Sequence, residues 1–280
     1  MTLIQQLTGL IEGNLNSAMS VKILAERSGY SERWLYNLFK EDAGISVAKY
    51  IRRRKLTLSA VLLRHTSLPI TDISFMYGFN SLQTFSRSFK QQFKSSPVRY
   101  RNADAWDMQY AQPVLYRRTQ CTEFKMLEIT QGEKKTTVLN KKPIRLGMDF
   151  IHIMNKGRFT YNQNLSEAIM SIYISTYAML DFLISGEMVP AEKTDSELIF
   201  YVKEIGEYTN PEKLLSDGLY ASQKFKGTYE QLCEFQMYDA MADLCTNKCI
   251  LKKGPMYTIC HRTAKENILT AQFLIPCLKL

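Results

Sequence analysis

The segment Ser81–Arg101 reads SLQTFSRSFKQQFKSSPVRYR and predicts one amphipathic helix with a defined start and end. Ser81 is a suitable N-cap, because its hydroxyl can accept a hydrogen bond from a backbone N–H of the first turn. Three phenylalanines recur every fourth residue and form an apolar stripe, at Phe85, Phe89 and Phe93. Pro97 cannot continue the helix. Polar and basic side chains occupy another side, as in a solvated surface helix or a helix that binds a ligand.

The same pattern occurs 50 residues earlier, in the segment SERWLYNLFK that spans Ser31–Lys40. Its capping serine, two apolar positions and its lysine match those of the later segment at a constant offset. Each copy follows a short helical stretch and a turn that contains glycine, Gly29 in the first and Gly78 in the second. Helix, glycine-containing turn and helix make the helix-turn-helix pattern, and two copies are much less expected by chance than one. The sequence therefore predicts an all-α domain of tandem helix-turn-helix units over residues 1–104.

The second copy resembles the closing motif of the AraC/XylS family of bacterial transcription regulators. The matching positions are Phe79, Ser81, Phe85, Arg87, Phe89, Lys90, Phe93, Pro97, Tyr100 and Arg101. Residues 1–101 are most similar to the MarA/SoxS/Rob subgroup, in which the DNA-binding domain comes first. The resemblance implies a transcription activator that binds double-stranded DNA as a monomer, with RNA polymerase as a further partner.

Positive charge is concentrated in the first part of the chain. Residues 1–105 contain 15 Lys and Arg against 7 Asp and Glu, a net charge of +8. Residues 106–280 contain 21 Lys and Arg against 20 Asp and Glu, a net charge of +1. The whole chain, with 45% hydrophobic and 22% charged residues, has the composition of ordinary globular domains, and its length suggests two. An anionic partner is therefore expected at the helix-turn-helix domain.

The remaining composition favours a cytoplasmic protein, associated with the nucleoid when bound to DNA. The first residues show no secretory signal, and no apolar stretch approaches the ~20 residues of a membrane span. Six irregularly spaced cysteines, all after residue 120, indicate reduced thiols. Cys245 and Cys249 make a weak zinc pair, because no second pair or nearby histidine completes four ligands. We expect no metal, cofactor or membrane partner.

Two kinds of contact are expected with DNA: Lys and Arg bind phosphates, and polar side chains read base edges in the major groove. The candidates are Arg33, Tyr36, Asn37 and Lys40 on the first recognition helix, Gln83, Thr84, Ser86, Arg87 and Lys90 on the second, and Arg52 and Arg54 on a joining helix predicted at Ser46–Leu63. Each is alternatively a solvated surface residue. Arg87 is the best candidate, because a guanidinium can pair with O6 and N7 of guanine. The two helices differ in these residues, so we expect an asymmetric site, with residues 1–105 sufficient for the contacts.

The second half predicts a mixture of strands and helices. Residues 105–123 lack a sustained period and are interpreted as an interdomain linker. Strands are predicted at Phe124–Ile129, Pro143–Ile153, Leu198–Ile205, 219–225, Met256–Cys260 and Ala271–Leu278, and helices over 165–180 and from a capping box at Thr228 and Gln231 to about Cys245. The order strand–helix–strand–strand thus occurs twice. We expect an α+β domain over residues 124–280.

This half resembles a GyrI-like effector-binding domain. The matching residues are Leu219, Tyr220, Ala221, Gly227, Tyr229, Leu232, Tyr257, Ile275 and Pro276. The resemblance implies a small-molecule effector, and the candidate pocket residues are Tyr201, Phe225, Tyr229 and Tyr257; ordinary core packing is the alternative for each. Many such domains hold cationic ligands with a Glu where this chain has Pro255, so a cationic effector held in that way is not expected.

The combined hypothesis is a non-enzymatic regulator whose first domain binds DNA and whose second domain senses a ligand or a partner. Two alternatives remain for the second domain: a small-molecule hydrolase, or a protein-binding module that never holds a ligand. An acidic residue facing an enclosed aromatic pocket would favour sensing. A filled core with an exposed apolar patch would favour a protein partner.

Overall fold

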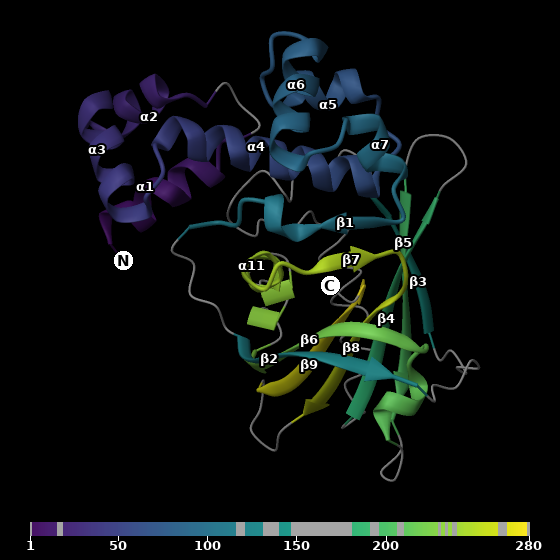
Figure 1. The fold of residues 1–280 in the computed structure, drawn as a ribbon. Coiled ribbons are helices and arrows are strands. Elements are labelled where there is room, and N and C mark those ends of the chain that lie inside the picture. Colours follow the sequence, from purple (N-terminus) through teal and green to yellow (C-terminus); the bar gives the residue numbers. More distant parts are fainter. Residues whose placement is uncertain are drawn as a thin grey trace. The chain divides into compact units, whose positions relative to one another are not determined.

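The structure is a computed structural model that describes residues 2–15, 19–115, 121–130, 140–146, 181–190, 196–205, 210–228, 231–232, 235–236, 240–262 and 268–278. These residues form two compact units (Figure 1). Of the described residues, 2–15, 19–103 and 110–115 belong to the helical unit, whereas 104–109 and those from 121 onward belong to the sheet unit. The chain therefore enters the sheet unit at residue 104 and returns to the helical unit at residue 110.

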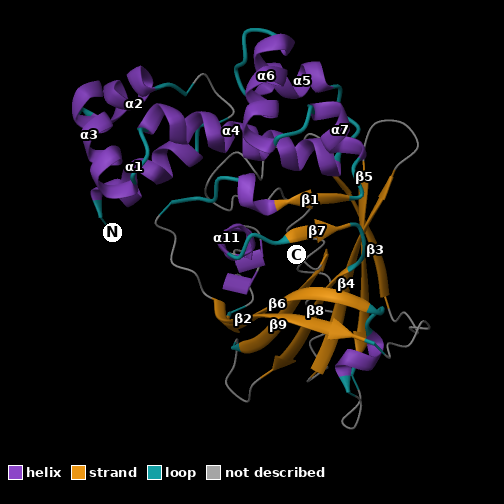
Figure 2. Cartoon of the chain, viewed as in Figure 1, coloured by secondary structure: helices purple, strands orange, loops and turns teal. Residues whose placement is uncertain are grey.

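The helical unit confirms the predicted tandem helix-turn-helix arrangement. Its helices are α1 (Leu3–Glu12), α2 (Val21–Ser28), α3 (Glu32–Ala43), α4 (Val47–His65), α5 (Ile70–Met76), α6 (Leu82–Phe93) and α7 (Pro97–Asn102). Helices α2 and α3 form the first helix-turn-helix unit, α5 and α6 form the second, and α4 joins them (Figure 2). Helix α4 begins where the sequence predicted and ends two residues later.

Local chemistry explains where the two recognition helices, α3 and α6, begin. The hydroxyls of Ser31 and Ser81 accept hydrogen bonds from the backbone N–H groups of Trp34 and Thr84. In the turns that precede them, Gly29 and Gly78 adopt φ angles of +74° and +72°, in the left-handed region that favours glycine. The two copies of the sequence repeat therefore have the same turn geometry.

The apolar stripes of the recognition helices form the core of the helical unit. Leu35 and Phe39 of α3 are fully buried, as are Phe85 and Phe89 of α6. The ring of Phe89 meets that of Tyr100 in α7 edge-on, with the centroids 5.3 Å apart. Since the stripes face inward, the polar sides of both helices face solvent.

The sheet unit is a curled antiparallel sheet. Its strands are β1 (Ala105–Asp107), β2 (Cys121–Ile129), β3 (Asn140–Leu146), β4 (Asp181–Pro190), β5 (Ser196–Glu204), β6 (Gly218–Gly227), β7 (Ile250–Lys252), β8 (Met256–Arg262) and β9 (Leu269–Leu278). Their order is β1-β7-β9-β8-β4-β5-β3, and β6 pairs with both β9 and β2. Two 3-10 turns, η1 (Met108–Tyr110) and η2 (Pro211–Leu214), and helix α11 (Ala240–Thr246) complete the described elements.

The strands predicted at 219–225, Met256–Cys260 and Ala271–Leu278 are present as β6, β8 and β9; between them the described helix α11 covers only the end of the predicted helix, and the unpredicted strand β7 follows it. The predicted capping box is present, because Thr228 N–H donates to Gln231 Oε1 at 2.9 Å and Gln231 N–H donates to Thr228 Oγ1 at 3.4 Å. In the first copy, β3 covers the start of the predicted strand, and the predicted helix over 165–180 lies outside the described residues. Strands β1, β4 and β7 were not predicted; β1 and β7 have only three residues each, too few to show a period.

Up to residue 115, the residues interpreted as a linker are packed into the two units. Ala105–Asp107 pairs with Ile250–Lys252 as an antiparallel ladder, and Met108 N–H donates to the carbonyl of Cys249 at 2.9 Å. Residues 110–115 pack within the helical unit. The backbone groups of residues 105–108 are thus hydrogen-bonded within the sheet unit, as buried main chain requires. Among the described helices, none is long and apolar enough to cross a membrane.

Candidate nucleic-acid interface

Helix α3 presents one polar face to solvent. Arg33, Tyr36, Asn37 and Lys40 are all exposed, and Tyr36 is 50% exposed. They lie between the buried positions of the stripe, at the spacing of a helix with 3.6 residues per turn. Trp34 is 37% exposed and stacks on Tyr30 with the ring centroids 4.1 Å apart. The four predicted candidates on this helix are thus brought together on one accessible face.

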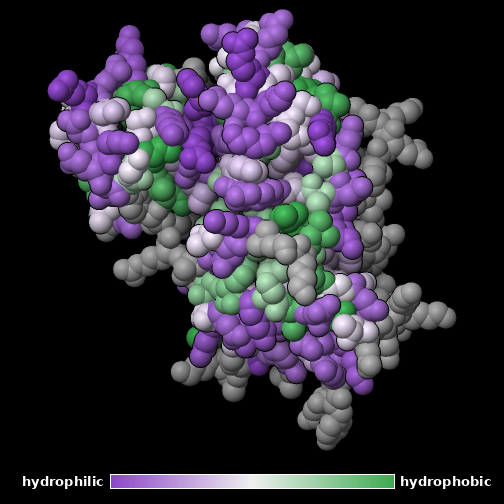
Figure 3. All heavy atoms as spheres, in the orientation of Figure 1, coloured by the Kyte–Doolittle hydropathy of each residue, from purple (hydrophilic) through white to green (hydrophobic). Residues whose placement is uncertain are grey.

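Helix α6 presents the equivalent face of the second unit. Gln83, Thr84, Arg87 and Lys90 are exposed, and Ser86 is half-buried. The hydroxyl of Thr84 lies 3.0 Å from that of the capping Ser81, so it is partly engaged within the helix start. In the face shown in Figure 3, the helical unit carries mostly hydrophilic residues. Both recognition helices therefore offer hydrogen-bonding and cationic groups to a partner in solvent.

The basic run on α4 divides into surface and interior residues. Arg52 is exposed and Arg53 is half-buried, whereas Arg54 is 5% exposed and Lys55 is 8% exposed. Burial lowers the pKa of Lys55. The structure contradicts the expectation that Arg54 reaches a DNA phosphate, because its guanidinium faces the protein interior. We leave Arg54 out of the interface and retain Arg52.

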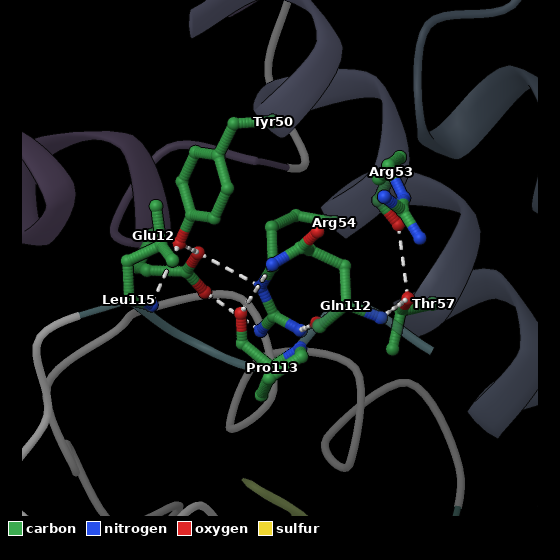
Figure 4. A network of polar contacts seen from close by, with 8 residues as sticks. All are labelled: Glu12, Tyr50, Arg53, Arg54, Thr57, Gln112, Pro113 and Leu115. Atoms are coloured by element: carbon green, nitrogen blue, oxygen red, sulfur yellow. Dashed lines mark hydrogen bonds and ion pairs between the residues drawn. The ribbon is translucent and has the colours of Figure 1, made fainter. Parts of the chain in front are cut away.

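Arg54 forms a buried ion pair with Glu12 at the end of α1 (Figure 4). Its Nε and Nη2 donate to the two carboxylate oxygens of Glu12 at 2.9 and 2.8 Å, a bidentate arrangement. Tyr50 donates its hydroxyl to the same carboxylate at 2.7 Å. Burial, and next the charge of Glu12, hold the pKa of Tyr50 well above its ordinary value, so the phenol stays a neutral donor. Sequence patterns gave no signal for this pair, whose members are 42 residues apart.

A hollow of about 380 Å³ opens in the helical unit between α3 and the start of α4. Lys40, Lys49 and Arg53 supply three cations to its lining, and the described lining residues include no acid. The hollow lies beside Tyr36, one of the candidates on the outer face of α3. An anionic group of phosphate size fits this charge balance.

The aromatic pocket proposed for the second half is not assembled as expected. Phe225 pairs with Ala271 and Tyr257 pairs with Leu274, both on β9. Paired residues share a face of the sheet and successive residues alternate. Since Ala271 and Leu274 are three residues apart, Phe225 and Tyr257 lie on opposite faces and cannot line one pocket.

Both of these aromatic residues belong to filled parts of the structure. Tyr257 packs edge-on to Tyr220, with centroids 5.8 Å apart, and its hydroxyl is 3.0 Å from that of Ser216. Phe225 packs on Phe235 with centroids 5.3 Å apart. Phe225 and Tyr257 are therefore ordinary core residues, which was the alternative to a place in an effector pocket.

Two of the pocket candidates are not tested by side-chain geometry. Tyr201 occupies the same rung as Tyr257, because both pair with Ser185, but its side chain lies outside the described residues. Tyr229 lies outside them altogether.

Comparison with known proteins gives a family match within the helical unit and several similar proteins. A family model described as a helix-turn-helix domain matches residues 24–103. The multiple antibiotic resistance protein MarA of Salmonella typhimurium is 44% identical over 91 residues, which make up 32% of this chain and 72% of that protein. Among solved structures, a transcriptional regulator with an AraC-type DNA-binding domain from Chromobacterium violaceum is 31% identical and has a TM-score of 0.33. That match covers 39% of this chain and 92% of the other.

A longer match reaches beyond the helical unit. The right origin-binding protein of Escherichia coli is 37% identical over 142 residues, 51% of this chain and 46% of that protein. The chain thus spans about half the length of this relative. The MarA match covers most of that protein, and its identity is high enough to show common family. This chain belongs to the AraC-type helix-turn-helix family of transcription regulators.

Proposed function

We propose that this protein binds double-stranded DNA at a specific sequence and regulates transcription there. The observation that carries the proposal is the pair of recognition helices, each capped by serine, preceded by a left-handed glycine and polar on its exposed face. A helix of this kind enters the major groove and contacts base edges with its first turns. The net charge of +8 on residues 1–105 supplies the attraction to phosphates.

The contacts divide into base reading and phosphate binding. Arg33, Asn37, Gln83 and Arg87 carry the groups that pair with base edges, and Tyr36 can contact a thymine methyl group. Lys40, Lys90 and Arg52 bind phosphates, as do Lys49 and Arg53 at the hollow beside α3. Thr84 and Ser86 supply hydroxyls that suit either partner.

Replacing Arg87 with alanine is expected to weaken binding to the specific site by about 1–3 kcal/mol, because a bidentate guanidinium contact is lost. Arg87→Lys keeps the charge but not the planar pair of donors, so it is expected to keep non-specific binding and lose discrimination at one base pair. Fluorescence anisotropy with the specific site and a scrambled site measures both. Wild-type affinity and discrimination in both variants would remove Arg87 from the interface.

The protein is expected to protect one asymmetric site per monomer. The two recognition helices differ in their exposed residues, whereas dimers that read palindromes use two identical helices. Helix α4 has 19 residues and spans about 28 Å at ~1.5 Å per residue, which suits successive major grooves about 34 Å apart. Footprinting combined with light scattering of the complex gives symmetry and stoichiometry. A palindrome bound only by a dimer would contradict this expectation.

For the sheet unit, we propose that it modulates DNA binding through a small-molecule effector or a protein partner, as the GyrI-like resemblance implies. The resemblance also leads us to propose that the protein activates transcription together with RNA polymerase. Transcription in vitro with purified polymerase tests activation, and it separates an activator from a repressor by the sign of the change.

A further inference from the structure

Residues 110–115, here called the strap, return from the sheet unit and lie within the helical unit. Side chains from α4 and α6 bind the main chain of the strap. Arg54 donates Nη1 to the carbonyl of Gln112 at 2.6 Å, and the N–H of Gln112 donates to Thr57 Oγ1 at 2.9 Å (Figure 4). Arg54 and Thr57 are neighbours on one face of α4, three residues apart. The backbone carbonyl and the backbone N–H of Gln112 are therefore both hydrogen-bonded to side chains of α4.

The strap also reaches the second recognition helix. Gln92 of α6 donates its Nε2 to the carbonyl of Tyr110 at 3.1 Å. The same amide lies 3.3 Å from Thr57 Oγ1 and 3.3 Å from the carbonyl of Arg53. Thr57 in turn donates to the carbonyl of Arg53 at 2.9 Å. One hydroxyl thus connects α4, α6 and the strap.

At its other side the strap is connected to α1, which packs against α2 and α3. The guanidinium that binds Gln112 is the one held by Glu12 of α1. Thr57, Arg54 and Glu12 are 3%, 5% and 6% exposed, so these bonds lie where water competes little. The strap is therefore bonded directly to α4 and α6, and through Arg54 to α1, which packs on the first helix-turn-helix unit.

We propose that the strap is part of the DNA-binding machinery and fixes the orientation of α3 relative to α6. A single joining helix sets the distance between the two recognition helices, and a second connection beside it restricts how the helices packed on each end of α4 can shift relative to α4. Thr57 and Gln92 are then positioning residues, which act on DNA recognition without touching DNA. This inference rests on the proposed function, and it replaces the expectation that residues 1–105 suffice for the full set of contacts.

The test measures how binding depends on the spacing of the two half-sites, with the full chain. In the wild type, inserting one base pair between the half-sites is expected to weaken binding about tenfold or more, because that insertion rotates one half-site by roughly a tenth of a turn. Thr57→Val keeps the shape of the side chain and removes its hydroxyl; Gln92→Leu removes the amide. Both variants are expected to lose affinity at the native spacing and to show a penalty for the insertion several-fold smaller than that of the wild type.

Two controls separate positioning from a general loss of stability. Thr57→Ser retains the hydroxyl and is expected to restore the wild-type spacing penalty, and Gln6→Leu makes the matched change at an exposed position of α1 and should leave it unchanged. A wild-type spacing penalty in folded Thr57→Val and Gln92→Leu, checked by circular dichroism, would overturn the role of the strap. Absence of any sequence preference in the wild type would instead overturn the proposed function.

Discussion

Replacing Glu12 with alanine is expected to lower the free energy of unfolding of the helical unit by about 3–5 kcal/mol. The side chains of Glu12 and Arg54 are 8% and 6% exposed, and the carboxylate accepts bonds from Arg54 and Tyr50. Removing the carboxylate takes from this mostly buried guanidinium the negative charge that lies 2.8 Å from it. Urea unfolding followed by circular dichroism at the helix band measures the loss.

The control for this prediction is a double replacement, Glu12→Met with Arg54→Met. Replacing both members of a buried ion pair by apolar side chains of similar volume is often neutral or stabilising, because the desolvation cost of both charges disappears. The double variant is therefore expected to be much more stable than Glu12→Ala. An unfolding free energy for Glu12→Ala within about 1 kcal/mol of the wild type would mean that the pair is open to water in solution.

Raising the salt concentration from 50 to 200 mM is expected to weaken DNA binding about 10³-fold if six phosphates are contacted. The reason is that the logarithm of the binding constant falls linearly with the logarithm of the salt concentration, with a slope of about −0.9 per phosphate. The sources of this dependence are the exposed cations of the helical unit, among them Lys40, Arg52 and Lys90. Titrations at four or five salt concentrations give the slope. A salt-independent affinity would mean that the positive charge of residues 1–105 lies away from the interface.

Two neighbouring arginines supply a sharp control for the salt experiment. Arg52 is exposed and Arg54 is buried against Glu12. Arg52→Ala is expected to reduce the salt slope by about one, because one phosphate contact is lost. On a scrambled site, where the orientation of the two recognition helices matters less, the double variant at positions 12 and 54 removes one positive and one negative buried charge and is expected to leave the slope unchanged. Equal slopes for Arg52→Ala and the wild type would remove Arg52 from the phosphate contacts.

The sequence alone determined the two helix-turn-helix repeats, because their signals are local. Caps, left-handed glycines and apolar residues at helical spacing each act over a few residues, so Ser31 and Ser81 mark their helices without reference to the rest of the chain. The same property explains the strands β6, β8 and β9 and the capping box at Thr228, which the sequence also predicted. The exposed faces of α3 and α6 followed from the buried ones, since a helix with one apolar stripe turns its other residues outward.

Tertiary structure decided which of several chemically similar residues are buried, paired or brought together. Arg52 and Arg54 are alike in sequence, but within the described part of the chain Arg54 is the one that meets a carboxylate, from a residue 42 positions away. Phe225 and Tyr257 were equal pocket candidates until strand register placed them on opposite faces. The strap has no period of its own, because its conformation is set by side chains of α4 and α6 that bind its main chain. Each of these outcomes depends on partners distant along the chain, and short-range patterns in a sequence carry no information about such partners.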